Sequence, residues 1–161
     1  MTTSSKINPK GRCMHTLTPD LGVDGAAKFM DCLRSGFQAE EVVRAPGPGG
    51  KLMHAHARIG DADLSFHDFF PELGMGPVTQ SNSSLTLHLY VPDADAVFAQ
   101  AQAAGCKVTL PLNDMFWGDR YGQVRDPFGF TWAIATHKED PTPEQIKERM
   151  AKMFSAGAPK Q

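Results

Sequence analysis

Alternating apolar and polar residues predict strands in several parts of the chain, most clearly in its last third. In Phe130–Ala135, large apolar residues alternate with small ones, which is the period of a strand that buries one face. The preceding Asp126-Pro127-Phe128-Gly129 is typical of a tight turn, because proline presets φ and glycine tolerates positive φ. We therefore expect Tyr121–Arg125 and Phe130–Thr136 to form a β-hairpin.

The pattern before this hairpin predicts the order strand, helix and three strands twice. Asp24 is the expected N-cap of the first helix, and Gly36 is the expected glycine at its C-terminal end. The remaining expected elements are strand Cys13–Thr18, helix Ala26–Ser35, a strand from Val42, hairpin strands Leu52–Arg58 and Ala62–His67, strand Leu85–Val91, helix Ala94–Ala104 and strand Lys107–Leu110.

An internal repeat supports this duplication. The two runs align at an offset of 69 residues, where caps, helix residues and hairpin glycines coincide. We therefore predict an α+β fold of two tandem βαβββ modules, with a mixed sheet curved round a cavity and a C-terminal helix. The matched pairs are Asp24 with Asp93, Ala27 with Ala96, Phe29 with Phe98, Gly36 with Gly105 and Gly60 with Gly129.

The predicted organisation has five segments. They are a frayed N-terminus (1–11), a first module (12–68), a linker or flap (69–83), a second module (84–137) and a C-terminal helix with its tail (138–161). Thr142-Pro143-Glu144-Gln145 predicts the start of that helix, because it combines an N-cap, a proline at the first helical position and a capping-box glutamine. The helix carries an apolar stripe that a second subunit would cover: Ile146, Met150, Met153 and Phe154.

Composition narrows the class of protein. A chain of 161 residues with 41% hydrophobic residues can bury a proper core. The net charge of −2, with no run of Lys or Arg, argues against a nucleic-acid or anionic-membrane surface. The absence of an apolar spanning run or signal sequence makes a cytoplasmic location the default expectation. Three cysteines without CxxC spacing are interpreted as reduced thiols: Cys13, Cys32 and Cys106.

Several motifs carry a family resemblance that covers nearly the whole chain. WGDRYG is followed by DPFG, a tryptophan and ATHKED, and Arg58-Ile59-Gly60-Asp61 and Leu87-His88-Leu89-Tyr90-Val91 come earlier. The chain thereby resembles the PhnB-like branch of the glyoxalase/bleomycin-resistance/dihydroxybiphenyl-dioxygenase family, the vicinal oxygen chelate superfamily. The resemblance implies paired βαβββ modules around a small-molecule cavity, without fixing a reaction. It also implies a homodimer, in which strands of two chains complete each other's barrels.

Strand alternation assigns candidate cavity residues, on the assumption that the most apolar faces pack against the helices. In the second module this leaves Thr86, His88, Tyr90 and Ala133 toward the cavity. The repeat transfers these positions to Leu17 and Leu64, with His15 and Phe66 on the same faces two residues away.

The resemblance does not extend to a metal site. Members such as glyoxalase I draw His and Glu ligands from positions that correspond here to Leu17, Leu64, Thr86 and Ala133, none of which is a good ligand. We therefore predict no metal and no other cofactor. A slip of two residues along a strand would bring in His15 and His88, which leaves a metal-dependent alternative open.

Three further residues have two interpretations each. His56 stands where related sequences carry an acidic residue, and it is either a substrate-contacting acid or base or a partly exposed strand histidine. Trp117 and Arg120 belong either to an aromatic plug with an Asp119–Arg120 pair or to the cavity rim.

His67 and His137 are expected to be structural, and Phe69-Phe70-Pro71 is either a flap or a linker.

The leading functional hypothesis is metal-independent binding of a small, partly apolar metabolite, with or without turnover. One alternative is a metal-dependent lyase or dioxygenase of the same superfamily. The other is a protein that sequesters a drug or antibiotic without chemistry.

Overall fold

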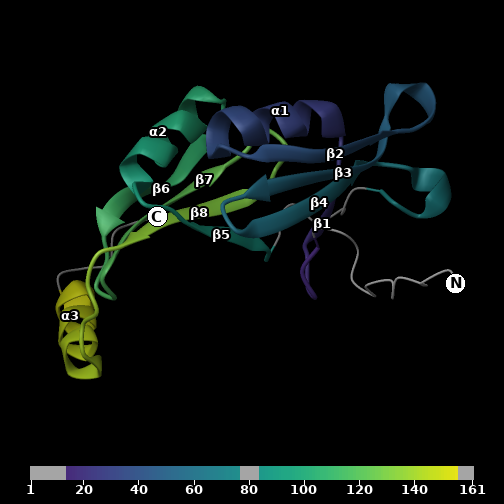
Figure 1. Cartoon of the computed structure of the whole chain (residues 1–161). Helices are drawn as coiled ribbons and strands as arrows, with labels where there is room; N and C mark the ends of the chain where they lie inside the picture. Colours follow the sequence, from purple (N-terminus) through teal and green to yellow (C-terminus); the bar gives the residue numbers. More distant parts are fainter. Residues whose placement is uncertain (1–13, 77–83, 156–161) are drawn as a thin grey trace, which may run out of the picture. The chain divides into compact units, whose positions relative to one another are not determined.

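A computed structural model describes residues 14–76 and 84–155. The chain divides into two compact units, residues 1–80 and 81–161. Each unit is a four-stranded mixed sheet with a helix on one face, and the second unit carries a further C-terminal helix (Figure 1). Within the described ranges, no helix combines the length and the apolar character required to cross a bilayer.

The first unit has the sheet order β1-β4-β3-β2, in which β1 is parallel to β4 and the other pairs are antiparallel. Its elements are β1 (Asp20–Val23), α1 (Ala26–Phe37), β2 (Glu40–Pro46), the 3-10 turn η1 (Pro48–Gly50), β3 (Leu52–Ile59), β4 (Ala62–Asp68) and the 3-10 turn η2 (Pro71–Leu73).

The second unit repeats this topology with the order β5-β8-β7-β6, again with one parallel pair, β5 and β8. Its elements are β5 (Thr86–Tyr90), α2 (Ala94–Ala103), β6 (Lys107–Asp114), β7 (Asp119–Arg125), β8 (Thr131–His137) and α3 (Pro143–Ser155). The predicted α+β architecture of duplicated βαβββ modules with a C-terminal helix is therefore confirmed.

The first strand lies later in the chain than predicted. Residues 14–19 are not strand, and β1 begins at Asp20. His15 and Leu17 consequently precede the sheet, and the Leu17 side chain is 88% exposed. Two candidate cavity residues therefore do not line the face of a strand.

The ends of α1 also differ from the prediction. Gly25, with φ of 91°, is the N-cap, and Gly36 lies inside a helix that ends at Gln38 in the left-handed region. The Asp68 carboxylate at the end of β4 accepts hydrogen bonds from the amides of Gly25, Ala26 and Leu52 at 2.7–3.0 Å. A distant carboxylate thus takes the role expected of Asp24, since the first helical amides have no partner within the helix.

The helices and the first and fourth strands of the two units match at an offset of 68 residues, whereas the second and third strands match at 67. Ala26 and Ala94 begin the helices, and the buried positions of α1 and α2 match at this spacing. The strand pairs Leu21–Phe66 and Leu89–Ile134 match as well. The offset of 69 is correct only for the glycines of the hairpin turns, because the β7–β8 turn is longer than the β3–β4 turn.

This difference of one residue reverses the faces of the first sheet, because successive strand side chains point to opposite sides. Phe66 packs edge-to-face on Phe29 of α1, with ring centroids 4.9 Å apart. By alternation, Leu64 also faces the helix, and both residues are buried. The prediction that Leu64 and Phe66 line the open face is wrong.

The capping box of α3 is confirmed. The Thr142 amide donates to Gln145 Oε1 at 2.8 Å, and the Gln145 amide donates to Thr142 Oγ1 at 3.3 Å. No described residue of α3 is buried, and Phe154 of the apolar stripe is 63% exposed.

The described part of the predicted flap folds onto the first unit. Phe70 is 3% exposed and pairs with Met75 through backbone hydrogen bonds. Lys51 Nζ lies over its ring, 5.1 Å from the ring centroid. The rest of the segment, 77–83, and the predicted frayed N-terminus, 1–11, lie outside the described residues.

Candidate functional site

The open face of the second sheet has a floor of small residues. Ala133 and Ala135 lie on β8, one strand in from the β5 edge, and their side chains point away from the face that Trp132 and Ile134 bury. Larger side chains flank them on both sides, because Ala133 pairs with His88 and Gln123, and Ala135 pairs with Tyr90 and Tyr121. The sequence placed Thr86, His88, Tyr90 and Ala133 on this face, and the strand register brings them together.

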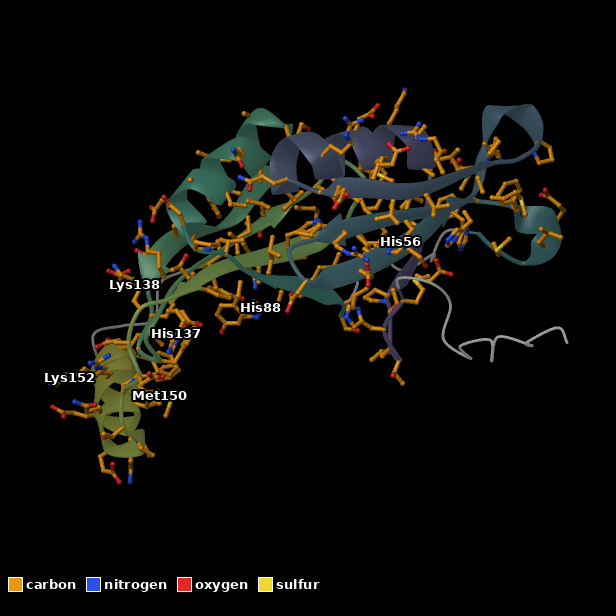
Figure 2. The ribbon with its side chains drawn as sticks, viewed as in Figure 1. His56, His88, His137, Lys138, Met150 and Lys152 are labelled. Atoms are coloured by element: carbon orange, nitrogen blue, oxygen red, sulfur yellow. The ribbon has the colours of Figure 1, made fainter. Side chains whose placement is uncertain are left out.

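Three rings form what we call the aromatic face, defined by His88, Tyr90 and Tyr121. The His88 and Tyr90 rings are stacked with centroids 4.7 Å apart, and His88 meets Tyr121 edge-on at 5.6 Å. Ala133 and Ala135 are 1% or less exposed, whereas Tyr90 is 58% exposed. His88 projects from the side of the sheet opposite α2 (Figure 2). The exposed ring surfaces can stack on a planar or apolar group.

A buried carboxylate anchors one end of the aromatic face. Asp119, only 2% exposed, accepts hydrogen bonds at Oδ2 from Tyr90 Oη at 2.8 Å and Trp117 Nε1 at 2.9 Å. His137 Nδ1 lies 2.7 Å from Oδ1, and His137 Nε2 lies 2.8 Å from Asp140. Asp119 therefore joins the second unit's β5, β7 and β8 at one point.

These contacts determine the protonation of the group. Burial raises the pKa of Asp119, but hydrogen bonds from His137, Tyr90 and Trp117 outweigh it and hold the pKa below its usual value. The hydrogen bond to Asp119 raises the pKa of Tyr90. Hydrogen bonds to Asp119 and Asp140 raise the pKa of His137. Near neutral pH, Asp119 is thus an anion that holds Tyr90 as a neutral donor.

The loop that carries Trp117 is fixed by a glycine. Gly118 has φ of 102°, and a Cβ there would clash with the Glu139 carbonyl oxygen. The Gly118 carbonyl in turn accepts from the amides of Lys138 and Glu139. Trp117 also meets Tyr121 edge-on at 5.4 Å, so its ring lies beside the aromatic face.

Arg120 does not pair with Asp119, because adjacent strand residues point to opposite faces. Its guanidinium forms a two-point ion pair with Asp95 of α2, at 3.0 and 2.7 Å, and lies 3.7 Å from Asp114. Arg120 therefore ties β7 to α2. Both sequence interpretations of Arg120, the pair with Asp119 and the rim of the cavity, are wrong.

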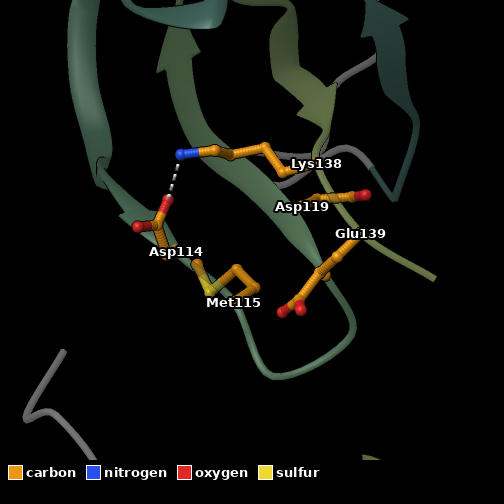
Figure 3. A pocket seen from close by; sticks show the side chains of 6 residues that line it. Asp114, Met115, Asp119, Lys138 and Glu139 are labelled. Atoms are coloured by element: carbon orange, nitrogen blue, oxygen red, sulfur yellow. Dashed lines mark ion pairs between the residues drawn. The ribbon is translucent and has the colours of Figure 1, made fainter. Parts of the chain in front are cut away.

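A surface pocket of about 290 Å³ lies behind the Asp119 loop (Figure 3). Charged residues dominate its lining, and Lys138 Nζ lies 3.8 Å from Asp114 across it. Local sequence patterns did not indicate this pocket, because its residues come from two separate stretches, 114–119 and 138–139. The lining residues are Asp114, Met115, Gly118, Asp119, Lys138 and Glu139.

The open face of the first sheet has a second buried carboxylate, Asp63, which the sequence analysis also missed. Asp63 Oδ1 accepts from His56 Nε2 at 2.8 Å and from Arg58 Nε and Nη2 at 3.1 Å. His15 Nδ1 lies 3.1 Å from Oδ2. Burial raises the pKa of Asp63, and the hydrogen bonds from His56 and Arg58 lower it by more.

His56 is 2% exposed, which corrects its interpretation as a partly exposed strand histidine. The alternation of polar Asp63 and Ser65 with apolar Leu64 and Phe66 carried the missing signal for this cluster. Within 14–76 and 84–155, no three His, Cys, Asp or Glu side chains are grouped so that they could hold a metal ion. A metal-free site stays a prediction.

Two βαβββ units, each with one helix-covered face and one open face, define the glyoxalase-type fold. The family model described as "Glyoxalase/Bleomycin resistance protein/Dioxygenase superfamily" matches residues 13–134. The chain therefore belongs to the glyoxalase/bleomycin resistance protein/dioxygenase superfamily.

Individual proteins similar to this chain support the same family and fold. Over 139 residues the chain is 39% identical to the uncharacterized protein Mb0911c of Mycobacterium bovis, covering 84% of this chain and 91% of that protein. The structure of TioX from Micromonospora sp. ML1 matches with a TM-score of 0.60 and 24% identity, over 80% of this chain and all of TioX. A PhnB protein from Bacillus cereus, described as a putative 3-demethylubiquinone-9 3-methyltransferase, matches with a TM-score of 0.62 and 18% identity, over 76% and 99%. These structures support the fold.

Proposed function

We propose that the protein binds a small, partly apolar metabolite on the aromatic face of the second sheet, without a metal. The observation that carries this proposal is the pair of small residues, Ala133 and Ala135, between flanking aromatic side chains on an otherwise polar, exposed face. Aromatic rings supply contact area at a low cost in conformational entropy. A planar or apolar ligand would stack on Tyr90 and His88.

The polar groups of this face would orient the ligand. The Tyr90 hydroxyl is directed to Asp119, which leaves its oxygen free to accept a further hydrogen bond. His88 can donate or accept at either ring nitrogen. A ligand with a phenol, amide or carbonyl group next to an apolar ring fits these partners, and binding alone requires no further chemistry.

A fragment titration followed by amide NMR tests the proposal. A panel of small phenols, aromatic amides and aromatic ketones is added to the full chain, and we expect saturable shifts at Ala133 and Ala135. Tyr90→Ala should weaken binding about tenfold, the effect of losing a stacking partner of about 1.4 kcal/mol. Phe154→Ala is the matched control, since it removes an exposed aromatic ring from α3. Equal weakening in both variants, or no saturable shift, would sink the proposal.

Metal content is measured on the same preparation. We expect protein purified without chelator to contain no stoichiometric zinc, nickel, iron or manganese, and these ions to leave its melting temperature nearly unchanged. A bound ion would add roughly 2.7 kcal/mol at a hundredfold excess over Kd. Near one metal per chain, lost in His15→Ala or His88→Ala, would favour the lyase or dioxygenase alternative.

A further inference from the structure

Two cations face each other across the edge of the second sheet without a counter-charge. Lys107 on β6 pairs directly with Arg125 on β7, and both are exposed. Among the residues that the structure describes, neither side chain has an ion-pair or hydrogen-bond partner. Like charges directly opposite each other destabilise an antiparallel pair. The chain therefore keeps a costly arrangement that a bound anion would relieve.

Arg125 is exceptional among the arginines within 14–76 and 84–155. The others all have a carboxylate within 4 Å, as the partners of Arg34, Arg44, Arg58, Arg120 and Arg149 show. Carboxylates are therefore available to the other arginines described, and the lack of one beside Arg125 is specific to its position.

Lys107 and Arg125 line a surface pocket of about 660 Å³ at this end of the sheet. Val108 and Pro127 are apolar members of this lining, and Val108, which pairs with buried Val124, points to the face opposite that of Lys107. Gly105 has φ of 98°, and a Cβ there would come within 3.5 Å of Pro127. The pocket shares no lining residue with the aromatic face, so it is a separate place on the unit.

The one carboxylate in this lining does not oppose an anion strongly. Asp126 is 4% exposed, and its oxygens accept from Phe128 N, Phe130 N and Trp132 Nε1 at 2.8–3.0 Å. These three donors occupy most of the acceptor sites of the carboxylate and direct its charge toward the turn. The cations of Lys107 and Arg125 stay exposed.

We propose that this pocket binds the oxyanion of a small organic anion, a phosphate monoester or a carboxylate, with Arg125 and Lys107 as its partners. The guanidinium fork matches two oxygens of such a group, and the ammonium adds a point charge. The apolar part of the ligand lies against Pro127. This site is independent of metabolite binding on the aromatic face.

A titration of the full chain with phenyl phosphate, inorganic phosphate and benzoate, followed by amide NMR at low salt, tests the site. We expect saturable shifts at Lys107, Thr109 and Gly129. Arg125→Gln and Lys107→Gln should each weaken phenyl phosphate binding by about fivefold or more. Lys147→Gln on α3, with the same loss of charge, should leave it unchanged. Tighter binding of phenyl phosphate than of benzoate assigns the phosphate class, and the reverse order assigns the carboxylate class.

The alternative role of Lys107 is to keep an edge strand from pairing with another chain. In that case Lys107→Gln would promote self-association and leave phenyl phosphate binding unchanged, which would overturn the proposal. Equal shifts at every surface lysine, or equal weakening by Lys147→Gln, would overturn it too. Both pocket variants should fold, because removing one charge relieves repulsion and should raise the melting temperature slightly.

Discussion

At the scale of single residues, Asp119 combines stability with the candidate site. Its carboxylate is almost completely buried, yet three side chains from different segments donate to it or lie within hydrogen-bond distance. A buried charge is stable only when such partners replace water. The orientation of Tyr90, and with it one edge of the aromatic face, therefore depends on this single group.

Asp119→Asn should destabilise the protein by about 1.5–3 kcal/mol, the range for hydrogen bonds to a buried charged group. The amide has only one oxygen, so its NH2 must face either the Tyr90 and Trp117 donors or His137 Nδ1. Urea denaturation measures the change in the free energy of unfolding. Asp114→Asn, at an exposed carboxylate of the same pocket, should have no measurable effect, and equal losses in both variants would contradict this account.

The pH dependence of stability should identify His137. Its pKa is raised in the folded state by Asp119 and Asp140, so its contribution is fully present below the unfolded value of about 6.5. That contribution is lost as the pH rises through the folded pKa. Denaturation at pH 5.5, 7 and 8.5 should show stability falling above about pH 6.5, and less of this fall in His137→Gln.

Leu17→Ala is the control for this pH series, because it changes an exposed residue and no titratable group. Its slope should equal that of the unmodified chain. Asp119 acts in the opposite direction: its pKa is lowered, so its contribution is present above the unfolded pKa and is lost as the pH falls through the folded one. A His137→Gln variant with an unchanged slope would refute the assignment.

At the scale of elements, the packing of α1 on the first sheet decides which face of that sheet is apolar and which is polar. Phe66, Phe29 and Met30 are fully buried between β4 and α1, and each side chain contributes about 1.5–3 kcal/mol through burial. The polar residues of β4 and β3 are then left on the open face, where His56 and Asp63 pair.

Phe66→Ala should therefore cost about 3–5 kcal/mol, the range for removing a buried phenylalanine. If Phe66 lined an open cavity instead, the loss would be far smaller and ligand binding would change first. Leu17→Ala, at an exposed position, should leave the melting temperature unchanged. Thermal or urea unfolding of the two variants distinguishes the two face assignments.

At the scale of the whole molecule, the chain joins two units of the same topology, and the described residues of α3 present an exposed apolar stripe. Met150 is 39% and Phe154 63% exposed. Exposed edges and apolar helix faces are commonly covered by a second subunit. A homodimer remains our prediction for this protein.

Light scattering at micromolar concentration should give twice the chain mass of 17.5 kDa. Met150→Glu combined with Phe154→Glu should shift the mass toward that of one chain, if α3 covers the partner. Lys147→Glu adds negative charge to the same helix and should leave the mass unchanged. A monomer mass for the unmodified chain would contradict the prediction.

Local periodicity determined which elements form and in what order. The hairpins, the helices at Ala26 and Ala94, the capping box at Thr142 and the duplication were all predictable, because each depends on residues near one another in the chain. The family resemblance followed from the same motifs.

Only the tertiary structure decided which face each residue of the first sheet occupies. A strand has a period of two, so the difference between an offset of 69 and one of 68 moved Leu64 and Phe66 from the open face to the core. Asp68 and Asp119 likewise acquired their roles from partners far away in sequence. Such contacts depend on how strands align in space, which local patterns do not encode.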